Sequence, residues 1–331
     1  MKLNTRRLVL GGMAALFSAG ALVPAAAQEA AWPTRQPITL IVPFGPGSSP
    51  DTMARAVAEE AGKTLGQTIV VQNRAGASGN LGTDLIAKAK PDGYTFGVSI
   101  TGPMVNNTVL YKSLPYDPFK DIAPLTLAVH QYNVLVVAAN SPIKTLADLV
   151  AEAKKPDAKL NFPSTGAGTV SHLAVELLLD RAGGKALHVP YKSSPDAVTS
   201  LISGDTNFAA LPPVAVMPMI KDGRLRPIAA IAAKRLSFLP EVPTAGELGY
   251  PGVEGSGWIG FVAPAGISDD VKTKLNDALT KALASPAVTQ RLTTMYMEPA
   301  PMTPDAFGKY MNEELERWAP LIKRLNLAGS I

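Results

Sequence analysis

The sequence predicts an α/β protein built from two αβ lobes. Strand-like and helix-like segments alternate along most of the chain, as in folds with largely parallel sheets. A second series of this kind follows the apolar run at residues 133–139, and the 331-residue chain is long enough for two domains of roughly 100–200 residues each. We therefore expect two hinge crossings, near residues 133 and 256, with a ligand cleft between the lobes.

The first lobe is expected to contain residues 28–132 and 256–331. It begins with a buried strand at residues 38–42, and a helix at residues 51–65 follows because apolar residues recur there at four-residue spacing. The other elements expected in this lobe are strands at residues 68–72, 95–99 and 258–263 and helices at residues 80–90, 269–284 and 303–325.

The second lobe is expected to contain residues 133–255. A Pro- and Gly-rich loop at residues 239–257 leads out of it. Its expected elements are a strand in the run 133–139, a capped helix at 141–153, a strand at 160–162, a helix at 170–181 closed by Gly183 and Gly184, and a strand at 186–189.

The first 27 residues have the layout of a secretory signal peptide. Basic residues precede an apolar run, and Ala25 and Ala27 fit the rule for cleavage near Ala27. The paired Arg6 and Arg7 favour twin-arginine export, with the Sec route as the alternative. We expect cleavage instead of a membrane anchor, because an anchor needs a longer and more apolar run.

Composition excludes several classes of function. Removal of residues 1–27 leaves 28 basic and 27 acidic residues, a net charge of +1, and no basic run that would follow a nucleic acid backbone. The chain has no cysteine, which excludes disulfides and thiolate chemistry. His130, His172 and His188 lack metal-ligand spacing. We therefore expect no nucleic acid partner, no metal and no cofactor.

No catalytic motif is complete in this sequence. The glycine-rich loops lack the last glycine of a dinucleotide fingerprint and the Gly-Lys-Ser/Thr of a phosphate-binding loop. The Gly-x-Ser-x-Gly elbow of α/β hydrolases is also absent. A Ser-x-x-Lys match at residues 141–144 falls where a helix is expected to begin and lacks its companion motifs. The sequence therefore indicates a binding protein, not an enzyme.

A loop at residues 42–52 joins the first strand to the first helix. Gly45 and Gly47 permit backbone angles closed to other residues, Ser49 suits an N-cap, and Pro50 suits the first helical position. Unpaired amides and the positive end of the helix dipole favour an anion there, although an ordinary capped turn would look the same. The hydroxyl donors of this loop are Ser48, Ser49 and Thr52.

The second lobe repeats this design at residues 162–172. A strand again runs through proline into a loop of Gly, Ser and Thr, and Thr169 can cap the helix that follows. One such loop in each lobe suggests a ligand with two anionic ends, each of which accepts several amides. A third glycine-rich turn, at residues 73–80, should lie beside the first loop, and we take its Arg74 as a solvated structural residue.

Four residues near these loops have two interpretations. Asp51 is ordinarily a partner of the helix dipole, and in an anion site it must act through water or recognise an amino or hydroxyl group. His172, in the first turn of its helix, can donate to the ligand or simply pack. Tyr191 and Trp258 lie near expected strand ends and belong to the cleft or to the core.

The candidate ligand-binding residues come from the two loops, from the glycine-rich turn and from the ends of expected strands. They are Phe44, Gly45, Gly47, Ser48, Ser49, Asp51, Ser78, Gly79, Thr101, Ser164, Thr165, Gly166, Gly168, Thr169, His172 and Tyr191.

Over essentially its whole length after residue 27, the chain resembles the Bug-type solute receptors of tripartite tricarboxylate transporters. The resemblance depends on many landmarks in the right order. They are residues 32–38, Val42-Pro43-Phe44, Val71-Gln72-Asn73-Arg74, Lys90-Pro91-Asp92-Gly93-Tyr94-Thr95, residues 114–118 and 120–121, Ser164-Thr165-Gly166-Ala167-Gly168-Thr169, Val189-Pro190-Tyr191-Lys192 and Val242-Pro243-Thr244.

The resemblance implies a type II periplasmic-binding-protein fold, a periplasmic location and closure around a di- or tricarboxylate, an acidic amino acid or an aromatic carboxylate. It also implies delivery to a permease of one large and one small membrane subunit, and we expect the receptor to be a monomer. In such receptors, loops corresponding to residues 44–51 and 164–169 hold carboxylates, partly through ordered water. Residues 45–49 and Ser193-Ser194 depart from the glycines usual in the family, which affects the identity of the ligand.

Two other functions fit an exported α/β protein. One is a hydrolase that uses Ser48 or Ser164 with His172, which requires the geometry of a catalytic triad. The other is a signalling input, in which the liganded receptor contacts a sensor instead of, or besides, a permease.

Overall fold

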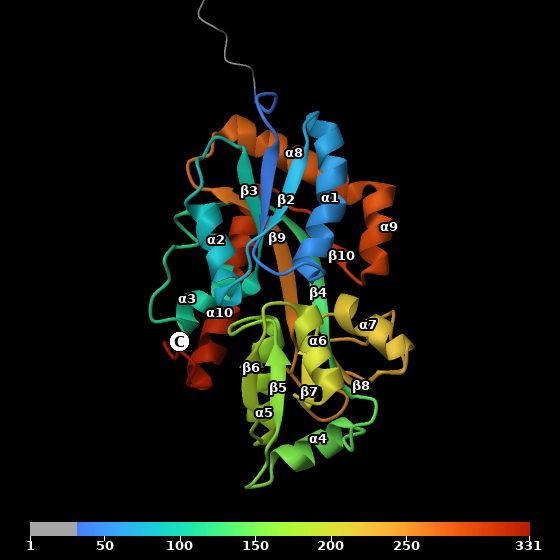
Figure 1. The fold of residues 1–331 in the computed structure, drawn as a ribbon. Helices are drawn as coiled ribbons and strands as arrows, with labels where there is room; N and C mark the ends of the chain where they lie inside the picture. Colours follow the sequence, from blue (N-terminus) through green and yellow to red (C-terminus); the bar gives the residue numbers. More distant parts are fainter. Residues whose placement is uncertain (1–31) are drawn as a thin grey trace, which may run out of the picture. The chain divides into compact units, whose positions relative to one another are not determined.

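The computed structural model describes residues 32–331, and the predicted signal peptide at residues 1–27 lies outside the described residues. The predicted α/β class is confirmed, because strands and helices alternate along the chain (Figure 1). No helix within residues 32–331 is long and apolar enough to cross a membrane.

The elements of the first half of the chain run from β1 to α5. They are β1 (Ile38–Val42), α1 (Ser49–Leu65), β2 (Ile69–Asn73), a 3₁₀ turn (Ala77–Gly79), α2 (Asn80–Ala87), β3 (Thr95–Ile100), a π-helical turn (Gly102–Asn106), α3 (Asn107–Leu110), β4 (Ile122–Ala138), α4 (Leu146–Ala153), β5 (Asn161–Ser164) and α5 (Val170–Ala182).

The elements of the second half run from β6 to α10. They are β6 (Leu187–Pro190), α6 (Ser194–Ser203), β7 (Phe208–Leu211), α7 (Pro213–Lys221), β8 (Leu225–Ile231), β9 (Ser256–Pro264), α8 (Asp269–Ala284), α9 (Pro286–Thr294), β10 (Glu298–Pro299) and α10 (Pro304–Arg324).

The first sheet has the strand order β10-β4-β9-β3-β1-β2. Strand β1 pairs in parallel with β2 and β3, whereas β9 runs antiparallel to β3 and β4. Four of the five residues of β1 are buried, which explains its nearly continuous apolar sequence, Ile-Thr-Leu-Ile-Val. Strand β2 is the edge strand, and its Val70 is 44% exposed.

Strand β4 is long enough to belong to two sheets. Its residues up to Tyr132 pair with β9, whereas its residues from Asn133 onward pair with β7 and β8 on either side. The parallel pair β5–β6 forms a separate two-stranded sheet. It lies next to the start of β7, because the amide of Asn161 donates to the side-chain oxygen of Asn207 and the amide of Asn207 donates to the Asn161 carbonyl. The partner of β4 therefore changes at the predicted crossing near residue 133.

Separate apolar clusters cover the two sheets. Helix α1 packs on β1 and β3, and helix α8 packs on α1 and β4, with Met53, Leu275 and Ile38 in one cluster. Helices α6 and α7 pack on β7 and β8, with Leu201 and Met217 in another cluster. As expected for the late helices, α8 lies against the first sheet (Figure 1).

The strands and helices expected from the sequence agree with the structure to within three residues at each end, except at the starts of α4 and β4. The N-cap of α1 is Ser48, not Ser49, because Pro50 occupies the second helical position. Helix α4 begins at Leu146 instead of residue 141, because Thr145 and the Asp148 that follows it form a capping box. Strand β4 begins at Ile122 instead of residue 133, because its first part pairs with β9. Helices α3, α6, α7 and α9 and strands β7, β8 and β10 were not predicted from the sequence.

Candidate functional site

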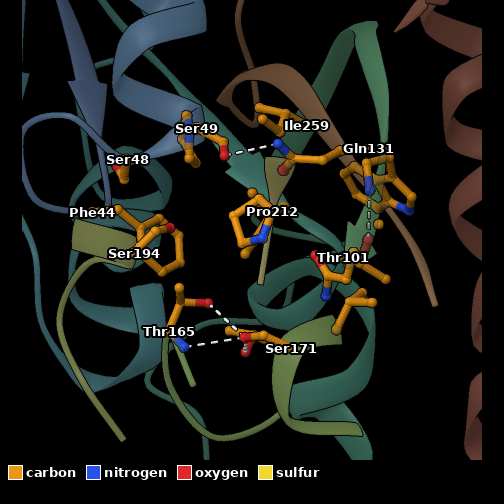
Figure 2. Close-up of a pocket in the computed structure, with 17 residues that line it drawn as sticks. Phe44, Ser48, Ser49, Thr101, Gln131, Thr165, Ser171, Ser194, Pro212 and Ile259 are labelled. Carbon is orange, nitrogen blue, oxygen red and sulfur yellow. Dashed lines mark hydrogen bonds between the residues drawn. The ribbon is translucent and has the colours of Figure 1, made fainter. Parts of the chain in front are cut away.

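A cavity with about 510 Å³ of empty space, which includes open solvent, lies where loops from both sheets meet (Figure 2). This main cavity lies at the carboxyl ends of β1, β3, β5 and β7, where open α/β sheets bind ligands. Its lining residues are Phe44, Ser48, Ser49, Pro50, Ile100, Thr101, Gln131, Asn133, Thr165, Thr169, Val170, Ser171, Ser194, Pro212, Gly257, Trp258 and Ile259.

The loop before α1 forms one end of the main cavity. Ser48 has extended backbone angles, as an N-cap requires, but its hydroxyl does not cap the helix. Instead, both the amide and the hydroxyl of Ser48 donate to the carbonyl of Gly45, at 3.3 and 2.6 Å. The next hydroxyl, that of Ser49, accepts a 2.8 Å hydrogen bond from the side chain of Gln131 on β4 (Figure 2).

The loop before α5 has the same geometry at the other end. The N-cap Thr169 donates both its amide and its hydroxyl to the carbonyl of Gly166, at 3.3 and 2.6 Å, and its side chain caps no helical amide. The Ser171 hydroxyl accepts from the amide of Thr165 at 3.1 Å and lies 3.0 Å from the Thr165 hydroxyl (Figure 2). The chain therefore builds the same turn twice, once beside each sheet.

Because neither N-cap side chain accepts a hydrogen bond from an amide of its helix, both helices begin with free amides. Within residues 32–331, the amides of Ser49 and Asp51 in α1 and of Val170 and Ser171 in α5 donate to no protein acceptor. Three of these four residues line the main cavity. Two helix N-termini with unpaired donors therefore border one cavity, an arrangement that favours anions.

The lining of the main cavity is polar but uncharged. None of the described residues that line it is Asp, Glu, Lys, Arg or His. Two of them carry buried donors without a protein acceptor, the side-chain amide of Asn133 and the indole N–H of Trp258. A charged ligand would therefore bind to neutral donors, between apolar walls that include Phe44 and Pro212.

Six of the candidate residues from the sequence line the main cavity. They are Phe44, Ser48, Ser49, Thr101, Thr165 and Thr169. Four others, Ser78, Gly79, Gly166 and Tyr191, line a second cavity of about 510 Å³. This side cavity shares Phe44 and Thr165 with the main cavity, so the two cavities adjoin.

The side chain of Asp51 is fully occupied by contacts outside both cavities. Its carboxylate accepts hydrogen bonds of 2.9 Å from the Gly47 amide, the Arg55 guanidinium and the Asn73 side chain. Burial alone would raise the pKa of Asp51, but these hydrogen bonds outweigh burial and hold its pKa below the usual value. Asp51 lines neither cavity and braces the turn at Gly47.

The other candidates that line neither cavity support the loops. Gly45 supplies the carbonyl that holds Ser48, and Ser164 is fully buried, with its hydroxyl 2.6 Å from His188 Nε2. Gly168 donates its amide to His172 Nδ1 at 3.1 Å, and the His172 side chain packs against Phe162 and His188.

The sequence analysis missed several polar residues of the main cavity. Gln131 and Asn133 are two positions apart on β4 and therefore face the same side of the strand. That spacing, at the predicted crossing, was the signal that could have identified them. Ser171 lies in the first turn of α5, and Ser194 lies in the first turn of α6. The start of α5 was predicted from the sequence, whereas α6 was not.

Comparisons with known proteins give consistent matches. A family model described as the tripartite tricarboxylate transporter family receptor matches residues 53–327. The chain is similar to the protein BugT of Bordetella pertussis, with 35% identity over 320 residues, 96% of this chain and 97% of that protein.

The same holds for solved structures. An R. palustris protein with adipate matches with a TM-score of 0.86 at 32% identity, covering 90% of this chain and 99% of the other. The periplasmic binding protein BugD gives 0.85 at 30% identity, covering 89% and 99%. MatC from Rhodopseudomonas palustris with bound malate gives 0.82 at 30% identity, covering 87% and 99%. These matches confirm the expected periplasmic-binding-protein fold.

Proposed function

Because the chain belongs to the receptor family of the tripartite tricarboxylate transporters, we propose that it captures a small organic carboxylate in its main cavity for delivery to a membrane permease. The observation that carries this proposal is the pair of uncapped helix N-termini, those of α1 and α5, beside one uncharged cavity. Each N-terminus offers unpaired amides to one carboxylate.

A dicarboxylate with an apolar middle fits this arrangement best. One carboxylate binds near Ser49 and Gln131, and the other near Thr165 and Ser171, which lie at opposite ends of the main cavity in Figure 2. The two related structures with adipate and malate both hold dicarboxylates, which supports the proposal.

The ligand cleft lies between two lobes in this proposal, one of residues 28–132 and 256–331 and the other of residues 133–255. The change of partner along β4, from β9 to β7 and β8 at Asn133, supports the first boundary. The start of β9 at Ser256, opposite Tyr132, supports the second. Both crossings then lie side by side, as a hinge requires.

The proposed location is the periplasm, after cleavage of residues 1–27, and the proposed active form is a monomer. The receptor would hand its ligand to a permease of one large and one small membrane subunit, the partner that the family description implies. Uptake of radiolabelled ligand by cells with and without this protein tests the step, and equal uptake in both would contradict it.

A hydrolase is the alternative function, and the contacts of its proposed residues argue against it. Ser164 is paired with His188 but is fully buried and lines neither cavity. Ser48 faces the main cavity, but its hydroxyl donates to a carbonyl and no histidine lines that cavity. These contacts support binding without chemistry, and turnover of an ester panel by the purified protein would contradict that view.

Thermal unfolding against a ligand panel tests the binding proposal. Adipate, malate, citrate, glutamate and benzoate are compared with adipamide and glucose, which are neutral. At about 100 times its dissociation constant, a true ligand adds about 2.7 kcal/mol of stability. We expect at least one carboxylate to raise the melting temperature and adipamide to have no effect. Stabilisation by the neutral compounds alone would sink the proposal.

A further inference from the structure

Two stacked histidines hold the loop at residues 164–169 from the side away from the main cavity. The rings of His172, on α5, and His188, on β6, lie 3.9 Å apart at an interplanar angle of 20°. Phe162, on β5, stacks on both rings. Neither histidine lines the main cavity, so neither touches a ligand bound there.

The contacts of His172 show which of its ring nitrogens accepts a hydrogen bond. Its Nδ1 atom accepts a 3.1 Å hydrogen bond from the amide of Gly168. A backbone amide is always a donor, so Nδ1 must carry a lone pair and the ring proton must sit on Nε2. Nε2 faces a carboxylate oxygen of Glu176 at 3.6 Å.

Gly168 connects this histidine to the first sheet. Its carbonyl accepts a buried 2.8 Å hydrogen bond from the side chain of Asn106, in the π-helical turn after β3. Its φ of +79° is in the left-handed region, and a Cβ at this position would collide with the side chain of Asn107. The backbone of Gly168 is therefore fixed from both sides, by His172 through its amide and by Asn106 through its carbonyl.

His188 holds the other end of the same loop. Its Nε2 lies 2.6 Å from the hydroxyl of Ser164, which also accepts from the Gly166 amide. Burial, with a contribution from neighbouring His172, lowers the pKa of His188 to about 3. The buried ring of His188 therefore resists protonation in the folded protein.

We propose that His172 is a positioning residue for carboxylate binding. It holds the loop at residues 164–169 in its binding geometry, and it does so only as a neutral imidazole with a free lone pair on Nδ1. This role rests on the proposed function, because it acts through the loop that binds one carboxylate. A proton on Nδ1 would face the Gly168 amide with a second donor and break the contact. Acid then weakens ligand binding through the protein, independently of the ligand's own titration.

In the part of the chain that the structure describes, the titratable groups that contact His172 are Glu176 and His188. The carboxylate of Glu176, one turn along α5, lies 3.6 Å from Nε2, and the ring of His188, on β6, stacks on the imidazole. From β5 and the π-helical turn, Phe162 and Asn106 contribute no charge.

Two substitutions separate the lone pair from the packing. His172→Asn keeps an acceptor oxygen near the position of Nδ1 but cannot become charged. His172→Phe keeps a flat ring for stacking but has no acceptor. His130→Phe is the matched control, because His130 lies on β4 against Tyr310 and lines neither cavity.

Affinity for adipate and malate is measured from pH 5 to 8 by calorimetry. We expect His172→Phe to lose at least about tenfold in affinity at pH 7.5, which is the ratio a single lost buried hydrogen bond can produce. His172→Asn should remain within about threefold of the unsubstituted protein and lose most of its pH dependence, because a neutral acceptor replaces a titrating one. His130→Phe should follow the unsubstituted protein.

Two results would overturn the inference while the proposed function stands. One is full affinity in His172→Phe, and the other is an unchanged pH profile in His172→Asn. NMR of the ligand-free protein gives a third test, which needs no ligand. We expect the Gly168 amide signal to move with the titration of His172. A proton found on Nδ1 at neutral pH would also overturn the inference. If the unsubstituted protein binds no carboxylate of the thermal-unfolding panel, the proposed function fails first and the positioning role fails with it.

Discussion

At the scale of single residues, Phe44 forms the most informative part of the site. It is 3% exposed and lines both the main cavity and the side cavity. Its ring packs on Gly79, where an added Cβ would lie 2.8 Å from the ring. Phe44 therefore forms part of the wall between the main cavity and the side cavity.

We predict that Phe44→Ala changes the preferred length of the ligand. Removing the ring joins the main cavity to the side cavity, so longer dicarboxylates should gain affinity relative to shorter ones. Dissociation constants for the series from succinate to azelate measure the effect. Phe238→Ala, which removes a ring packed on Tyr296 outside both cavities, is the control. The same order of affinities in Phe44→Ala and the unsubstituted protein would contradict the prediction.

The burial of His188 predicts how the folding stability of the protein changes with pH. Its pKa is about 3 in the folded protein, lowered mainly by burial, against 6.5 when unperturbed. As pH falls from about 6.5 towards 3, the unfolded chain takes up a proton at His188 that the folded protein does not. The contribution of His188 to the free energy of unfolding is therefore complete above this pH window. It falls as the pH decreases through the window, by up to about 1.4 kcal/mol per pH unit.

The measurement is denaturant unfolding at pH 7.5 and pH 4.5. We expect His188→Gln, which still offers a hydrogen bond to Ser164, to lose less stability between these pH values than the unsubstituted protein. Equal losses in the two proteins would mean that His188 is not held neutral by its surroundings.

How well the sequence predicts the site differs between loops and strands. Both Gly/Ser/Thr loops were identified because glycine and N-cap residues act locally. Gln131 and Asn133 were missed because their role depends on which face of β4 meets the cavity, and this is set by pairing with β9 and β8. His188 was missed as a partner of Ser164 for the same reason, since β5 and β6 pair only in the folded chain.

At the scale of elements, two kinds of helix start occur in this chain. At α4, Thr145 caps the helix by accepting from the amide of Asp148. At α1, the Ser48 side chain donates to Gly45 and leaves the helix uncapped. The first kind stabilises the fold, whereas the second keeps amides available for a ligand.

The two kinds of helix start predict opposite phenotypes. Thr145→Ala should lower the free energy of unfolding by about 0.5–2 kcal/mol and leave ligand affinity unchanged. Ser48→Ala should weaken affinity more than it lowers stability, because its hydroxyl shapes the loop instead of capping the helix. Chemical denaturation and calorimetry on both variants measure the pair. The reverse pattern would show that Ser48 stabilises the helix after all.

Element boundaries were predictable where local signals end a helix. Helix α8 begins and ends at the predicted residues, Asp269 and Ala284, because Ser268 supplies a side-chain cap at its start. The start of β4 was wrong by eleven residues, since Ile122 is a strand residue only through its pairing with Pro264 on β9. Pairing between distant segments leaves no local signal.

At the scale of the whole molecule, β4 makes the two sheets depend on each other. The same strand pairs with β9 in one sheet and with β7 and β8 in the other. Unfolding either sheet removes pairing from a strand that the other sheet needs. The hydrogen bond between Asn106 and Gly168 adds a second connection between the sheets.

We therefore predict a single cooperative unfolding transition for the protein after removal of residues 1–27. In scanning calorimetry, the van't Hoff and calorimetric enthalpies should agree, and a bound carboxylate should shift the whole transition upward. Two resolved transitions, with only one moved by ligand, would contradict this view of β4.

Because the lining of the main cavity is uncharged, binding of a charged ligand would change the net charge of the receptor. A dicarboxylate would bring two negative charges into a site where no described side chain neutralises them. The processed chain is expected to be nearly neutral, so the occupied protein would carry a net charge of opposite sign to the empty one. In an electric field the two forms would migrate in different directions near neutral pH. A membrane partner with a charged face would then attract one form and repel the other at a distance, before any contact is made.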